Sequence, residues 1–136
     1  TGTISRLIAP KVNKVIGIEL MKEAVEMAQE NSAMDECENC EFIQGDVLAK
    51  LDELHQKPEI IIIDPPRPGI HPEALHKIIA AGAREIIYVS CKPETQARDL
   101  EEFTRENYEI EDLKAIDMFP HTEHIEVITH LIKKEL

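Results

Sequence analysis

Short runs of β-branched and other apolar residues alternate along the chain with longer stretches in which apolar side chains recur at helical spacing. The four runs cover residues 14–18, 41–44, 60–63 and 85–89. The helices that we predict after them cover residues 21–33, 47–54, 71–81 and 93–106. Because the strands are continuously apolar and alternate with helices, the pattern predicts an α/β fold with a parallel sheet packed against helices.

The last part of the chain departs from this alternation. Residues 108–118 and 125–133 are both strand-like, and no helical pattern separates them. Strands that follow each other without a helix between them form antiparallel hairpins. We therefore expect a mostly parallel sheet to which a C-terminal hairpin adds antiparallel edge strands. The 136 residues suffice for one compact domain, which we expect to cover residues 1–136.

The composition narrows the classes of function. The 27 acidic and 15 basic residues give a formal charge of −12, which excludes a domain that binds nucleic acid by electrostatics alone. No run approaches the ~20 apolar residues of a membrane span, and the start lacks a basic and then apolar leader. Cys37, Cys40 and Cys91 cannot all pair with one another. We therefore expect a reduced, cytoplasmic setting.

Ligands of open α/β sheets bind at the carboxyl ends of the strands, so the residues that follow each run are the candidates for a site. Glu19 closes the first run, 17 residues after Gly2 in the turn T-G-T-I-S. An acidic residue about 20 positions after a glycine-rich turn binds ribose hydroxyls in dinucleotide folds. An ordinary surface glutamate before a helix explains the same pattern. Asp46 follows the second run, where it could cap the next helix or contact an adenine amino group.

Two sharper motifs follow the third and fourth runs. Asp64 begins D-P-P-R-P-G, where two prolines restrict the backbone, so the motif suits a rigid binding loop as well as a proline-rich turn with a capping aspartate. Cys91 lies in S-C-K-P, at a strand end and just before a predicted helix. A helix N-terminus and the neighbouring Lys92 both stabilise a thiolate. This position favours a nucleophile over a buried structural cysteine.

Two patterns could suggest a metal site. His121 and His124 are three residues apart, but they lie in a proline-containing loop without the helical geometry of a zinc site. Cys37-x-x-Cys40 lacks the second pair that a structural zinc site needs. We therefore expect no metal in residues 1–136.

Taken in order and spacing, D-P-P-R-P-G, S-C-K-P and D-M-F-P-H-T-E-H-I-E (residues 117–126) resemble the RNA 5-methyluridine methyltransferase family. The opening T-G-T-I resembles the end of that family's cofactor loop, D-x-Y-C-G-T-G-T-I, and G-I-E at 17–19 resembles its ribose-binding strand. The resemblance covers the whole chain. It implies a Rossmann-like methyltransferase that uses S-adenosylmethionine to methylate carbon 5 of a uridine in transfer or ribosomal RNA.

The resemblance also implies roles for single residues. Cys91 falls at the position of the nucleophile and Glu126 at that of the general base. Four further residues fall at positions of the S-adenosylmethionine site: Thr3, Glu19, Asp46 and Asp64. Lys92 departs from the family, which often has asparagine at this position.

Parts of the family's pattern lie outside residues 1–136. These are the first strand, most of the cofactor loop, and an upstream RNA-binding barrel that often carries an iron–sulfur cluster. We therefore expect a catalytic domain truncated at its N-terminus, whose RNA substrate is bound mainly through other regions. A methyltransferase acting on another base or a small molecule, and a non-catalytic remnant of the fold, are the alternatives. Neither methylation of an amino group nor a scaffolding role needs a Cys–Glu pair.

Overall fold

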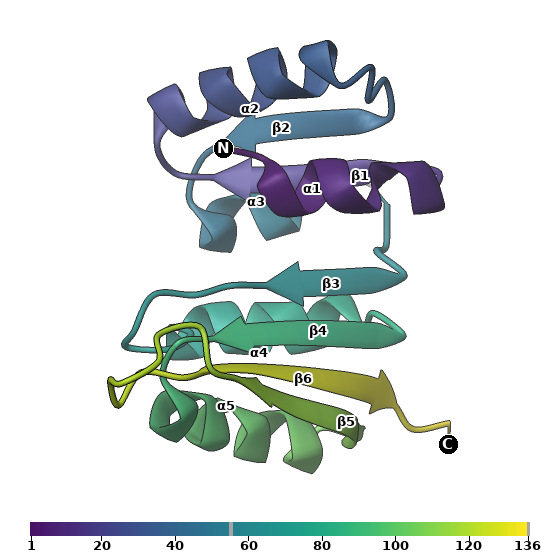
Figure 1. Ribbon diagram of the computed structural model, residues 1–136. Coiled ribbons are helices and arrows are strands. Elements are labelled where there is room, and N and C mark those ends of the chain that lie inside the picture. The colour runs from purple at the N-terminus through teal and green to yellow at the C-terminus, as the bar shows by residue number, and fades with distance from the viewer. Residues whose placement is uncertain (55, 136) are drawn as a thin grey trace. The chain divides into compact units, whose positions relative to one another are not determined.

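The computed structural model of the chain describes residues 1–54 and 56–135 (Figure 1). It divides into two compact units, Thr1–Leu54 and His55–Leu136, and each unit is described by itself. The predicted alternation of strands and helices is confirmed, and the bounds of the predicted elements differ from the observed ones by at most two residues. That residues 1–136 form a single domain stays a prediction.

The first unit contains a two-stranded parallel sheet. Its elements are α1 (Thr3–Ile8), the short 3-10 helix η1 (Ala9–Lys11), β1 (Val15–Glu19), α2 (Lys22–Met34), β2 (Cys40–Gln44) and α3 (Val47–Glu53). The register runs from Val15 opposite Cys40 to Glu19 opposite Gln44. The carboxyl ends of both strands therefore lie at one edge, and Figure 1 shows the N-terminus of the chain beside their arrowheads.

The ring of Phe42 on β2 packs directly against the backbone of Gly2 and of Gly17. A Cβ atom on Gly17 would lie 2.8 Å from the Phe42 ring, and one on Gly2 would lie 3.0 Å from it. Gly2 also has φ of 72°, a left-handed conformation that glycine adopts without steric cost. The turn that begins α1 therefore depends on glycine for both its conformation and its contact with β2.

The second unit contains a four-stranded mixed sheet with the strand order β3-β4-β6-β5. Its elements are β3 (Ile60–Ile63), α4 (Pro72–Ala81), β4 (Glu85–Ser90), α5 (Pro93–Arg105), β5 (Tyr108–Ile116) and β6 (Glu126–Lys133). Strand β3 pairs in parallel with β4, whereas β6 is antiparallel to both β4 and β5. The predicted α/β fold with an antiparallel C-terminal hairpin is confirmed.

The position of β6 corrects one expectation. Both strands of the hairpin were expected at the edge of the sheet, but β6 lies between β4 and β5, so that of the two hairpin strands β5 alone is at an edge (Figure 1). The burial pattern agrees, because alternate residues of β6 are buried while residues 109–116 of β5 are exposed. Strand β6 is an inner strand because it forms hydrogen bonds with β4 on one side and with β5 on the other.

The core of the second unit is built around aromatic side chains of the sheet and of α5. Tyr88, Phe103 and Tyr108 are fully buried. The rings of Phe103 and Tyr108 meet edge to face, with their centroids 5.8 Å apart. The Tyr108 hydroxyl donates to the carbonyl oxygen of Ala83 at 2.8 Å, and burial raises the pKa of Tyr108, so this donor keeps its proton at physiological pH. The contact fixes the start of β5 against the segment that leads into β4.

Among residues 1–54 and 56–135, no helix has the length and apolar character that crossing a membrane requires.

Candidate functional site

One edge of the four-stranded sheet gathers the three motifs of the second unit. Asp64 follows β3 and Cys91 follows β4, and because these strands are parallel both residues lie at the same edge. Strand β6 runs the other way, so its first residue, Glu126, also lies there. Residues about 60 positions apart in the sequence are thus brought to one edge of the sheet, as expected for an α/β site.

The pairing of β4 with β6 places Cys91 beside Glu126. The antiparallel ladder between the two strands ends with Ser90 opposite Val127. Cys91 is the next residue along β4, and Glu126 is the preceding residue along β6. Each residue is one position beyond that last pair, so the two side chains start from backbone positions at the same end of the ladder. Both residues are partly buried, and the Cys91 thiol is free.

The backbone around Cys91 is held by the side chain that precedes it. The Ser90 hydroxyl accepts a hydrogen bond from the Lys92 amide at 3.1 Å and lies 3.2 Å from the Lys92 carbonyl oxygen. Pro93 then begins α5, in the first turn where its missing N–H costs no hydrogen bond. Cys91 therefore lies in a short turn that is fixed by β4 on one side and by α5 on the other.

Helix α5 also holds the loop that follows Asp64. Gly69 has φ of 85°, and the amide of Ile70 donates to the buried carboxylate of Asp99 at 2.8 Å. The Arg98 guanidinium donates to the Pro68 carbonyl oxygen at 3.1 Å. The Asp64 carboxylate itself is exposed and accepts no hydrogen bond from residues 1–54 or 56–135. The loop is thus anchored at its far end, while its first residue stays open to a ligand.

The loop before Glu126 is stabilised by its own hydrogen bonds. Asp117 accepts from the amide of Phe119 at 3.2 Å, and the Thr122 hydroxyl donates to the Phe119 carbonyl oxygen at 2.8 Å. His121 has φ of 71°, which gives the loop a sharp turn. His121 and His124 are both exposed, as is the Phe119 ring. This loop therefore presents polar and aromatic side chains at the same edge as Cys91.

The remaining predicted residues lie in the first unit, at the edge formed by the carboxyl ends of β1 and β2. Glu19 is partly buried at the end of β1, and one of its carboxylate oxygens accepts from the Met21 amide at 3.1 Å. Asp46 caps α3 by accepting from the Leu48 amide at 2.8 Å, so the capping role considered for it is confirmed. Thr3 begins α1 and is exposed. The adenine, ribose and other cofactor contacts of these three residues stay predictions.

No three histidine, cysteine or acidic side chains lie close enough to hold a metal ion in the part of the chain that the structure describes. Cys37 and Cys40 are free, and their thiols lie near the carbonyl oxygens of Asp35 and Ser5, respectively. Desolvation, Cys40 and Asp35 all raise the pKa of the Cys37 thiol. Because metals bind the thiolate, a raised pKa disfavours metal binding at this pair.

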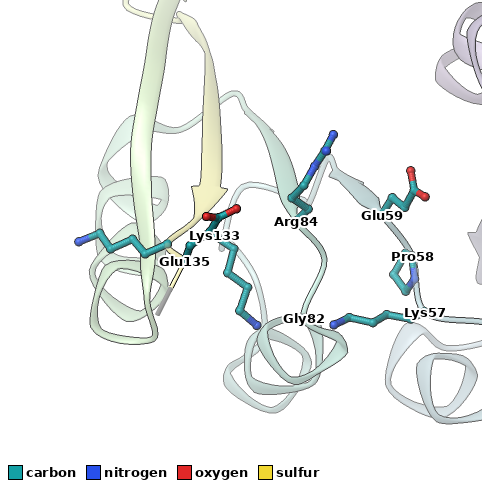
Figure 2. A pocket seen from close by; sticks show the side chains of 8 residues that line it. Lys57, Pro58, Glu59, Gly82, Arg84, Lys133 and Glu135 are labelled. Atoms are coloured by element: carbon teal, nitrogen blue, oxygen red, sulfur yellow. The ribbon is translucent and has the colours of Figure 1, made fainter.

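A basic pocket of about 300 Å³ lies at the opposite edge of the four-stranded sheet (Figure 2). Its lining residues are Lys57, Pro58, Glu59, Gly82, Arg84, Lys133, Lys134 and Glu135. The ammonium groups of Lys57 and Lys133 both lie 3.2 Å from the position that a Cβ atom on Gly82 would take. Gly82 ends α4, and cations are stabilised at a helix C-terminus. The C-terminus of α4 therefore favours the two ammonium groups, and the pocket lies at the end of the sheet opposite Cys91.

Sequence reasoning missed two polar residues near the site, Gln96 and Asp99, which are 2% and 1% exposed. Both bond to groups of β4 or of the loop after β3. A signal for them was present, because they recur at helical spacing with the apolar residues Leu100 and Phe103. Polar residues on the apolar face of a helix indicate buried hydrogen bonds.

Known proteins resemble this chain over nearly its whole length. Residues 1–134 match the model of the tRNA (uracil-5-)-methyltransferase family. The chain is 49% identical over 135 residues to an RNA methyltransferase of Clostridium tetani and 52% identical over 133 residues to one of Caldanaerobacter subterraneus, both described as uncharacterized. These alignments cover 99% and 98% of the chain. The chain spans about 30% of the length of each relative.

Solved structures of methyltransferases also match the chain. The crystal structure of the tRNA (uracil-54, C5)-methyltransferase of Pyrococcus abyssi, in complex with S-adenosyl-L-homocysteine, matches with a TM-score of 0.82 and 34% identity. It covers 96% of this chain, which corresponds to 32% of that protein. An rRNA methylase of Streptococcus thermophilus matches with a TM-score of 0.76 at 16% identity, a likeness of fold alone. With its fold, its motifs and its relatives in agreement, the chain belongs to the tRNA (uracil-5-)-methyltransferase family.

Proposed function

We propose that the protein of which this chain is a part transfers a methyl group from S-adenosylmethionine to carbon 5 of a uridine in RNA, with Cys91 as nucleophile and Glu126 as general base. The observation that carries the proposal is the position of these residues at the end of the β4–β6 ladder. Cys91 follows Ser90 and Glu126 precedes Val127, and Ser90 and Val127 form the last pair. The reaction needs both groups at one ring, on neighbouring carbons. Backbone positions next to the end of one ladder support this requirement.

The chemistry explains why a cysteine is needed. Carbon 5 of uracil is too weak a nucleophile to take a methyl group unaided. When the Cys91 thiolate adds to carbon 6, a carbon–sulfur bond forms and the electron pair of the ring double bond makes carbon 5 nucleophilic. Covalent catalysis of this kind divides one difficult step into easier ones.

Glu126 completes the cycle. After carbon 5 has gained the methyl group, the Glu126 carboxylate removes the proton that remains there. The electron pair of that carbon–hydrogen bond re-forms the double bond between carbons 5 and 6, the carbon–sulfur bond breaks, and Cys91 is released as a thiolate. A base within hydrogen-bond reach of the proton is required for this step.

S-adenosylmethionine supplies the methyl group as an electrophile and leaves as S-adenosylhomocysteine. The residues proposed to hold it are Thr3, Glu19, Asp46 and Asp64. Glu19 fits this role because the Met21 amide occupies only one of its carboxylate oxygens, which leaves acceptor capacity for ribose hydroxyls. The exposed carboxylate of Asp64 fits as well. The S-adenosyl-L-homocysteine in the related Pyrococcus abyssi enzyme supports the same ligand class.

The RNA substrate is proposed to be transfer or ribosomal RNA, bound mainly by regions outside these 136 residues. The formal charge of −12 supports this division, because RNA backbone contacts depend on lysine and arginine. A uridine in a folded RNA has to leave its stack to reach a pocket at the sheet edge. The cytoplasmic setting stays a prediction.

The test of the proposal is the product. The full-length protein, incubated with S-adenosylmethionine and unmodified transfer or ribosomal RNA, is expected to produce 5-methyluridine, measured by mass spectrometry of the digested RNA. The position of the methyl group decides between the alternatives, since methylation of a nitrogen or of another base would contradict the proposal. Transfer to free nucleosides alone would favour a small-molecule enzyme.

Replacing Glu19 by alanine is expected to weaken S-adenosylmethionine binding by roughly 1.5–3 kcal/mol, the range for hydrogen bonds that involve a charged group. Calorimetry on the full-length protein measures the change. Glu19→Gln separates this effect from the lost contact with the Met21 amide, because the glutamine oxygen still accepts that bond. Glu30→Ala, on the exposed side of α2, is the matched control. Unchanged affinity in Glu19→Ala would remove this residue from the site.

A further inference from the structure

We infer that Gln96 is a positioning residue that holds Glu126 in place for proton removal at carbon 5. The inference rests on the proposed function. It concerns a side chain of helix α5, whereas the proposed reacting groups lie at the ends of strands β4 and β6. Gln96 is in the first turn of α5, five residues after Cys91, and is 2% exposed.

The contacts of Gln96 join the two strands that carry the reacting groups. Its side-chain nitrogen donates to the carbonyl oxygen of Tyr88 on β4 at 3.0 Å and to that of Val127 on β6 at 3.2 Å. Val127 directly follows Glu126, and the β4–β6 ladder ends at Val127. One buried amide group, with two hydrogens, therefore connects both strands near the end of the ladder to the helix that begins beside Cys91.

The two reacting groups differ in how many other anchors they have. Cys91 lies in a turn that β4, α5 and the Ser90 hydroxyl all hold. Glu126 is preceded by the loop 117–125 and pairs with Ile116 of the edge strand β5. Loss of the Gln96 contacts therefore frees the start of β6 more than it frees the turn around Cys91. We therefore expect a slower rate of proton removal by Glu126 when these contacts are lost.

Helix α5 keeps its place without Gln96 because Asp99 anchors it independently. Asp99, one turn further along, accepts from the Tyr88 hydroxyl and from the Ile70 amide, both at 2.8 Å. Burial, together with Asp99 itself, raises the pKa of Tyr88, so the tyrosine stays protonated and keeps donating. A variant at position 96 is therefore expected to fold with α5 still attached to β4.

The experiment compares Gln96→Met with the wild type in the full-length protein. Methionine fills a similar volume but has no donor. Four quantities are measured. These are kcat and KM for methyl transfer, the number of active sites trapped by RNA that carries 5-fluorouridine, and the fraction of enzyme joined covalently to ordinary RNA during turnover. Per active site, kcat is expected to fall roughly tenfold. KM for S-adenosylmethionine should stay within about twofold, and the fraction joined to ordinary RNA should rise.

Tyr108→Phe is the matched control, because it removes another buried donor to a carbonyl oxygen at the opposite edge of the same sheet. It is expected to lower stability without raising the covalently joined fraction. Two results would overturn the inference. In the first, total activity falls only in proportion to the number of active sites that can be trapped. In the second, kcat per active site is unchanged. Failure of the wild type itself to methylate uridine or to be trapped would instead overturn the proposed function, and the inference with it.

Discussion

Replacing Cys91 by alanine is expected to abolish methylation of RNA, with a fall in kcat of at least about 10³-fold, because carbon 5 is then never activated. The same change should prevent covalent capture. In the wild-type full-length protein, RNA with 5-fluorouridine at the target is expected to form a stable adduct when S-adenosylmethionine is present. Fluorine replaces the proton that Glu126 removes, so the carbon–sulfur bond cannot break after methyl transfer. The adduct is measured on a denaturing gel.

Cys37→Ala is the control for this experiment, since it removes another partly buried free thiol, at a position outside the proposed mechanism. It should leave both methylation and adduct formation close to wild type. If Cys91→Ala methylates RNA at a rate near that of the wild type, the membership of the family stands, but the covalent mechanism is wrong.

Replacing Glu126 by glutamine is expected to lower kcat by about 10²- to 10⁴-fold, the contribution of a positioned general base. The effect on the covalent adduct should be opposite to that of Cys91→Ala, which forms no adduct. Thiolate addition and methyl transfer do not need the Glu126 carboxylate, so methylated RNA should accumulate as an adduct on Cys91 even with ordinary uridine. Denaturing gels and mass spectrometry of the adduct check this result.

Glu123→Gln is the control for the second experiment, because Glu123 is an exposed glutamate of the same loop. Its activity should match that of the wild type. A Glu126→Gln protein that neither methylates nor accumulates an adduct would place Glu126 at an earlier step. A residue with a merely structural role would lower the number of active sites in both experiments without separating addition from release.

The sequence predicted the elements of this chain and the places of its candidate site residues because both depend on local patterns. Continuous apolar runs such as 60–63 and the helical spacing of 93–106 identify strands and helices without knowledge of the fold. A residue that follows a parallel strand lies at the active edge of any α/β sheet, which placed Asp64 and Cys91 there. The helical spacing of Gln96 indicates that it is buried, but which groups it bonds depends on the fold, because its partners Tyr88 and Val127 lie on two strands that are far apart in the sequence.

The sequence by itself thus determined which residues are available for chemistry: a cysteine after β4 and a glutamate at the start of the last strand. Only the tertiary structure decided that their backbone positions lie at the same end of one strand pair. A C-terminal strand can pair with any free edge, and the sequence pattern of 125–133 was compatible with an outer position. In the fold, β6 inserts between β4 and β5, so Glu126 comes to lie beside Cys91, 35 residues earlier in the chain. Strand pairing between distant segments depends on the packing of the whole sheet, which local periodicity does not encode.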